Sequence, residues 1–180
     1  MRQENLETNV LPLKSDTGEL KIFFVGVGSA FSKLNNQTNL VIVKKETSLL
    51  IDCGTKTPQA LFNLGHPVTD FNNILITHSH ADHIGGMEEC LLNFRYFAKR
   101  KVNLITTKEY KSIMWNYSLK GGSGFNERHN ETGLKLTDFC NIILPKKITK
   151  FPREGYETDL DGLNIKMFRT KHIPDNAKSW

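Results

Sequence analysis

The segment ILITHSHADHIGG, residues 74–86, contains three of the six histidines of this 180-residue chain together with one aspartate. The apolar run ILIT at its start is typical of a buried strand. The stretch IGGMEECLLNFRYFAKR, residues 84–100, has the apolar spacing of an amphipathic helix. A strand that runs through a polar motif into a helix is typical of an α/β domain. The segment therefore predicts this fold class and marks the place where chemistry is expected.

The sequence before this segment predicts strands. KIFFVGVGSAF, residues 21–31, starts as a strand and is broken by glycines. NLVIVKKETSLLIDCG, residues 39–54, predicts two strands joined by a polar hairpin turn. Because a hairpin precedes the alternating strands and helices, we expect a mixed sheet rather than a wholly parallel one.

Further elements are predicted from apolar runs and their periodicity. We expect strands in KVNLITT, residues 101–107, and LNIKMFRTKHIPD, residues 163–175, and helices in PQALFNLGH, residues 58–66, and KEYKSIMWNYSLK, residues 108–120. The polar, glycine-rich stretch GGSGFNERHNETG, residues 121–133, is expected to be a loop or insertion.

Length and composition favour one domain without membrane segments. A chain of 180 residues suits a single buried core. The first twenty residues are polar and aperiodic, so we expect residues 1–20 to be a polar leader and residues 21–180 to form the domain. No stretch approaches the roughly 20 apolar residues of a membrane span, and the N-terminus lacks the apolar core of a signal peptide. These features predict a cytoplasmic protein.

Charge and cysteine content indicate which substrates and which functional residues to expect. The net charge of +5 comes from scattered lysines and arginines and mildly favours anionic substrates such as phosphate esters or nucleic acid. The three cysteines are widely spaced and form no CxxC pair, so they indicate neither a disulfide framework nor a cysteine zinc site. We therefore look for metal-binding or catalytic groups among histidines and carboxylates.

The histidine motif has the spacing of a metal site. Residues two apart in extended backbone point to the same face, so His78 and His80 can bind one ion. Asp82 and His83 follow where the chain turns into a helix, and His172 ends a distant strand-like run. Imidazole and carboxylate ligands suit zinc, with manganese or iron as alternatives, and five such ligands exceed what one tetrahedral zinc needs. Two metal ions are therefore expected.

These residues resemble a known family. HSHADH after the strand ILIT, LLIDCG before it and TKHIPD after it resemble the motifs of the metallo-β-lactamase-fold hydrolases. The stretches VGVGSAF and NNQTN resemble the phosphodiesterase branch, which includes ribonuclease Z and cyclic-nucleotide phosphodiesterases, among them phage anti-Pycsar enzymes. The resemblance implies an αββα sandwich, which we expect to be truncated in its C-terminal half.

The resemblance also assigns roles. It implies that His78, His80 and His172 hold one metal and that Asp82 and His83 contribute to the second. Asp52 would orient a ligand imidazole from beneath the site. The family pattern also has a later bridging aspartate and a final histidine, and neither maps onto this sequence.

The expected function is hydrolysis of a phosphodiester in a cyclic nucleotide or an RNA. Two metal ions would activate water to the attacking hydroxide, and Asp82 would take a proton during attack. Two alternatives stay open: another hydrolase of the same fold acting on a thioester, lactone or β-lactam, and a non-catalytic nucleotide-binding protein. A homodimer is expected from the family.

Overall fold

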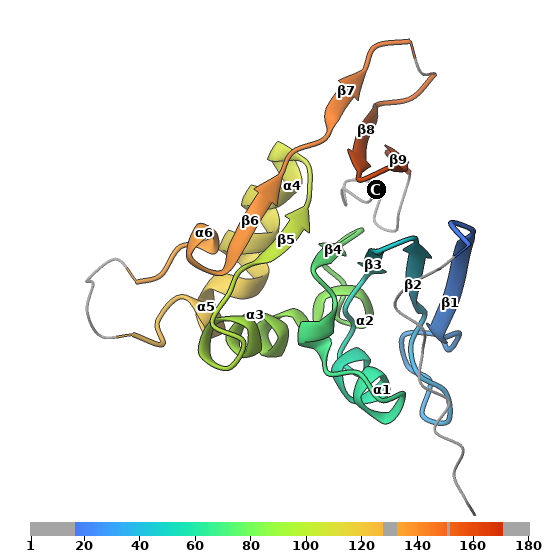
Figure 1. Cartoon of the computed structure of the whole chain (residues 1–180). Helices are drawn as coiled ribbons and strands as arrows, with labels where there is room; N and C mark the ends of the chain where they lie inside the picture. The colour runs from blue at the N-terminus through green and yellow to red at the C-terminus, as the bar shows by residue number, and fades with distance from the viewer. Residues whose placement is uncertain (1–16, 128–132, 151, 171–180) are drawn as a thin grey trace, which may run out of the picture.

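A computed structural model describes residues 17–127, 133–150 and 152–170 of the chain. Its larger sheet has six strands in the order of the sequence (Figure 1). The strands are β1 Leu20–Gly26, β2 Asn39–Lys44, β3 Thr47–Ile51, β4 Asn73–Leu75, β5 Val102–Ile105 and β6 Cys140–Ile143. β1, β2 and β3 pair antiparallel, whereas β3 to β6 pair parallel. The predicted mixed sheet is confirmed.

Helices follow the strands and cover one face of this sheet (Figure 1). They are α1 Thr57–Asn63, η1 Val68–Asp70, α2 Ala81–Ile84, α3 Met87–Tyr96, α4 Lys108–Ile113, the π-helical turn η2 Met114–Leu119, α5 Lys120–Ser123 and α6 Leu136–Phe139. The single helix predicted over residues 84–100 is wrong in one respect. The backbone N–H of Gly86 donates to the carbonyl of Cys53, which separates α2 from α3. The loop predicted over residues 121–133 begins later, because α5 extends into it.

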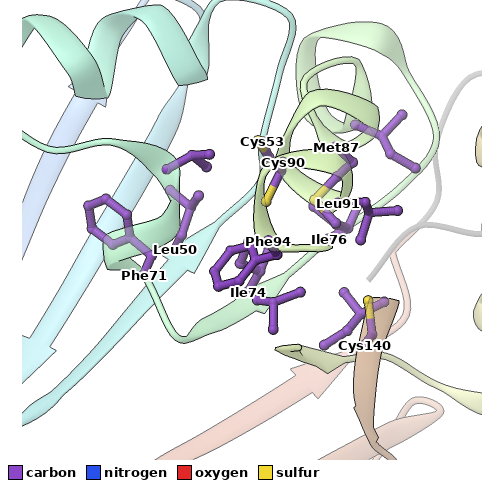
Figure 2. Packing of buried hydrophobic residues seen from close by; sticks show 14 of the residues in the cluster. Leu50, Cys53, Phe71, Ile74, Ile76, Met87, Cys90, Leu91, Phe94 and Cys140 are labelled. Atoms are coloured by element: carbon purple, nitrogen blue, oxygen red, sulfur yellow. The ribbon is translucent and has the colours of Figure 1, made fainter. Parts of the chain in front are cut away.

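The main core lies between the helices and the sheet (Figure 2). Strand residues such as Leu50 and Ile74 face α3, which contributes Met87, Leu91 and Phe94. All of these side chains are fully buried. Burial of large apolar side chains on one helix face is the main stabilising contribution to such a layer.

A second sheet covers the opposite face of the first (Figure 1). It consists of β7 Lys146–Ile148, β8 Gly155–Leu160 and β9 Leu163–Phe168, paired antiparallel. A separate apolar cluster joins the two sheets and contains Leu49, Leu75, Ile105, Tyr156, Leu160, Leu163 and Met167. Because alternate strand residues point to opposite faces, Leu49 enters this cluster while Leu50 enters the other. The helix, sheet and sheet layers match the predicted α/β sandwich.

Candidate active site

The histidine motif lies at the carboxyl end of two neighbouring parallel strands. Ile51, the last residue of β3, pairs with Leu75, the last residue of β4. Asp52 follows the first strand, and residues 77–83 follow the second. Loops at the carboxyl ends of parallel strands converge on one edge of the sheet, which is where α/β proteins bind ligands. The parallel pairing therefore explains why two segments distant in sequence form one site.

His78 and His80 face each other. Nε2 of His78 lies 3.0 Å from Nδ1 of His80, and the ring centroids are 4.7 Å apart. The strand predicted to carry both residues ends at Leu75, so they lie in the following loop, where His80 still has extended backbone angles. Two nitrogens bound at about 2.0–2.1 Å to one tetrahedral zinc are separated by roughly 3.3 Å. The spacing of this pair is close to that value.

Asp82 and His83 form a second pair in α2. Nε2 of His83 lies 3.2 Å from Oδ2 of Asp82. The His83 ring also approaches the His78 ring, with 4.0 Å between centroids. The two pairs of donor atoms are therefore adjacent, one at the end of the loop and the other in the first turn of the helix.

Asp52 supports the second pair from beneath. Its Oδ2 lies 2.6 Å from Nδ1 of His83, and its Oδ1 accepts hydrogen bonds from the backbone N–H and the hydroxyl of Thr77 at 2.7 and 2.9 Å. Asp52 is 4% exposed and has a φ of +65°, a left-handed conformation that costs free energy in residues other than glycine. Its backbone N–H donates to the carbonyl of Leu75. The strained turn aims the carboxylate at the histidine.

The pKa of His83 reflects this environment. Burial lowers it, but the hydrogen bond and negative charge of Asp52, together with the charge of Asp82, act in the opposite direction. The net result is a pKa raised above its ordinary value. The carboxylate of Asp52 thus favours an imidazole that carries a proton on Nδ1, which leaves Nε2 directed towards Asp82.

The structure brings together five of the six residues that the sequence singles out. His78, His80, Asp82, His83 and Asp52 lie within one connected set of contacts. His172 lies outside the described residues. Within residues 17–127, 133–150 and 152–170, no three histidine, cysteine or carboxylate side chains are arranged as a complete metal-binding group. The donors in the two facing pairs are imidazole nitrogens and a carboxylate, which are ligand types that zinc, manganese and iron accept.

Other residues of the site carry no sequence signal of their own. The hydroxyl of Thr77 contacts Asp52 and lies 3.0 Å from Nδ1 of His78. The side chain of Asn39 accepts from the N–H of Gly54 at 2.9 Å and donates to the carbonyl of Asp82 at 3.4 Å. Apart from the contact between the adjacent residues Thr77 and His78, these hydrogen bonds join residues 15 to 43 positions apart, so local sequence patterns do not reveal them.

Gly54 allows the closest backbone approach in the site. A Cβ atom there would overlap the carbonyl of Asp82 and would lie 2.9 Å from the side-chain oxygen of Gln37. The turn after β3 can therefore pack directly on the start of α2 only because residue 54 has no side chain. The glycine of LLIDCG thus has a structural explanation.

Comparison with known proteins identifies the family. The family model of the anti-Pycsar protein Apyc1 matches residues 20–180. The chain belongs to this family. Anti-Pycsar proteins Apyc1 from Bacillus phage 010DV004 and Bacillus phage BSP38 are 44% and 35% identical to it over 156 and 160 residues. The protein of the same name from Paenibacillus xerothermodurans is 33% identical over 158 residues.

The chain spans about 60% of the length of these relatives, while the matches cover 86–88% of the chain itself. The family resemblance that the HSHADH and GSAF motifs carry is thus confirmed.

Solved structures show the fold. The crystal structure of the metallo-β-lactamase fold protein YhfI from Bacillus subtilis has a TM-score of 0.52 and 15% identity, with coverage of 83% of this chain and 56% of YhfI. The chemotaxis sensor ODP has a TM-score of 0.51 and 15% identity, with coverage of 93% and 55%. The predicted metallo-β-lactamase-like fold is confirmed.

The described part of the chain contains no helix with the length and apolar character needed to cross a membrane.

Proposed function

We propose that this protein is a metal-dependent phosphodiesterase that acts on a cyclic nucleotide or an RNA phosphodiester. The observation that carries the proposal is the pair of facing donor sets: Nε2 of His78 with Nδ1 of His80, and Nε2 of His83 with Oδ2 of Asp82. Membership of the anti-Pycsar family supports it, as do the motifs that resemble cyclic-nucleotide phosphodiesterases.

His78 and His80 would hold one divalent ion, to which His172 would add a ligand, and Asp82 and His83 would hold a second. Zinc suits these donors best, and manganese or iron would be accepted. When bound, such ions supply Lewis-acid chemistry, which makes water nucleophilic near neutral pH and offsets negative charge on a phosphoryl group.

Neighbouring residues of the chain orient the proposed ligands. Asp52 accepts the Nδ1 proton of His83 in a hydrogen bond and so fixes the orientation and tautomer of that ring. Thr77 donates to Asp52 and keeps the carboxylate in place. Asp82, which lines the pocket at the site, would accept a proton as water attacks the phosphodiester. No side chain of the protein is needed as a covalent nucleophile.

Hydrolysis assays test the proposal. Protein loaded with zinc or manganese is incubated with bis(p-nitrophenyl) phosphate, with cyclic nucleotides and with a short RNA, and in parallel with a thioester, a lactone and a β-lactam. We expect cleavage of phosphodiesters and its loss in Asp82→Asn. Cleavage of carbonyl substrates alone would support the other hydrolase class. Binding of nucleotides without turnover would support a non-catalytic protein, and either result would contradict the proposal.

A further inference from the structure

A pocket of about 730 Å³ opens beside the histidine motif. Its lining includes His80, Asp82 and His83 together with residues of the loop after β1. Its size lies within the roughly 300–1,000 Å³ typical of pockets for small organic ligands. A substrate that places its phosphate at the histidines and fills this pocket would therefore contact the loop.

The loop is held in place by Gln37 and Lys56. Gln37 is 6% exposed, and its side-chain amide donates to the carbonyl of Ala30 at 3.2 Å, while its Oε1 accepts from the backbone N–H of Lys56 at 3.2 Å. The ammonium of Lys56 donates to the carbonyl of Ser32 at 2.6 Å. These bonds tie the loop to the segment after β3, which packs on α2 through Thr55 and the carbonyl of Ala81. The segment after β3 thus holds both the loop and the histidine motif in place.

Two exposed side chains of this loop do not contribute to its packing. The Phe31 ring is 87% exposed although it lines the pocket. Lys33 is also exposed and lines the pocket, and its ammonium has no hydrogen-bond partner or ion-pair partner among the described residues. Lys56, the other cation of the pocket, already donates to two backbone carbonyls, those of Ser32 and Asn35. An aromatic ring and an available positive charge therefore line the same pocket as His80 and His83.

We propose that Phe31 and Lys33 are the residues that select a nucleotide at this site. Phe31 stacks on the nucleobase, and Lys33 pairs with the phosphate. Aromatic rings bind bases through their faces with little sequence preference, and a lysine binds phosphate as a point charge. This inference rests on the proposed function, because it identifies how the same site distinguishes nucleotides from other phosphate esters.

Equilibrium binding of two probes tests the inference without catalysis. Adenosine 5′-monophosphate carries a base, and ribose 5-phosphate does not. Calorimetric titration of the chain, with and without zinc, should give about 5- to 150-fold tighter binding of the nucleotide, the range expected for one stacked base. Phe31→Ala should remove this preference. Lys33→Ala should weaken both probes by a similar factor and keep the preference.

Matched variants on other faces are the controls. Phe97 is 80% exposed at the end of α3, and Lys150 is exposed after β7; neither lines the pocket. Phe97→Ala and Lys150→Ala should leave both affinities unchanged. Since Phe31 and Lys33 are exposed, their variants should unfold at the temperature of the unmodified chain, which thermal denaturation verifies.

Equal binding of the two probes, or a preference that survives Phe31→Ala, would overturn the inference. The proposed function and this inference can be refuted separately. A chain that cleaves phosphodiesters without any base preference contradicts only the inference. A chain that prefers the nucleotide through Phe31 but cleaves no phosphodiester contradicts only the proposed function.

Discussion

Oδ2 of Asp52 lies 2.6 Å from Nδ1 of His83, and this contact joins the end of β3 to the first turn of α2. We expect Asp52→Asn to lower metal affinity by about 10–100-fold, because the imidazole loses the carboxylate that orients it. Asparagine tolerates the positive φ at this position, so the backbone should be kept. Competition with a chromogenic chelator measures the affinity.

Asp70 offers a matched control for this substitution. Its Oδ2 lies 2.7 Å from Nδ1 of His66, in an aspartate–histidine pair that takes no part in the contacts of the site. Asp70→Asn should leave metal affinity unchanged. If both variants lose affinity equally, Asp52 has no specific role in orienting His83.

Metal binding should stabilise the folded chain. Zinc at about 100 times its dissociation constant adds about 2.7 kcal/mol to the free energy of unfolding, which raises the melting temperature by about 5 °C or more for a chain of this size. A chelator should reverse the shift. His80→Ala should reduce it because one ligand is lost, whereas His66→Ala should not. Thermal denaturation followed by circular dichroism measures each case, and a shift that is the same in all three proteins would count against the assigned ligands.

Gly54→Ala should destabilise the protein by about 1–3 kcal/mol, since a methyl group at residue 54 meets the carbonyl of Asp82. The comparison is Gly121→Ala in α5, where a Cβ has nothing within 4 Å. Alanine favours a helix over glycine, so Gly121→Ala should be neutral or stabilising. Urea denaturation gives both free energies of unfolding. Equal stability of the two variants would show that the turn and α2 are not in contact.

The cysteines should react slowly in the folded protein. Cys53, Cys90 and Cys140 are buried, and burial raises the pKa of the Cys140 thiol to about 12. A thiol-reactive dye at mildly alkaline pH should label the native chain slowly and all three thiols at once in concentrated guanidinium chloride. Rapid labelling of the native chain would contradict the packing in Figure 2.

The sign of the pH effect follows from the same burial. Above about pH 9 the unfolded chain loses thiol protons that the folded chain keeps at Cys140. The free energy of unfolding therefore falls as the pH rises from about 9 towards 12. Denaturation at several pH values, compared with Cys140→Ala, checks this contribution. An equal slope in both proteins would assign the effect to other groups.

Much of the fold follows from local patterns. The apolar runs in β1, β2, β3 and β5 predict the strands, and the hairpin turn at Lys45 follows from its polar neighbours. The strand β4 is shorter than predicted because the N–H of Thr77 donates to the carboxylate of Asp52 instead of a neighbouring strand. β8, Gly155–Leu160, has the sequence GYETDL, which contains no apolar run, so the sequence does not predict this strand.

The candidate site also has one part that the sequence predicts and one part that it does not. The spacing of His78, His80 and His83 predicts a cluster, since these residues are neighbours in sequence. The supporting contacts of Gln37 and Asn39 depend on the packing of three separate loops, and a sequence alone does not reveal them. The roles of the motif residues as metal ligands, the contribution of His172, the division into leader and domain, the cytoplasmic location and the homodimer stay predictions.

The order of strand pairing in the larger sheet has a consequence for biosynthesis. β1, β2 and β3 form an antiparallel meander of sequence neighbours, with a tight turn between β2 and β3, whereas each later strand needs a crossover. Local contacts form faster than non-local ones, and chains fold from the N-terminus as they leave the ribosome. The meander that ends beside Asp52 can therefore form before the segment at Thr77, 25 residues further along the chain, packs against it. The candidate site would then assemble onto a support that already exists.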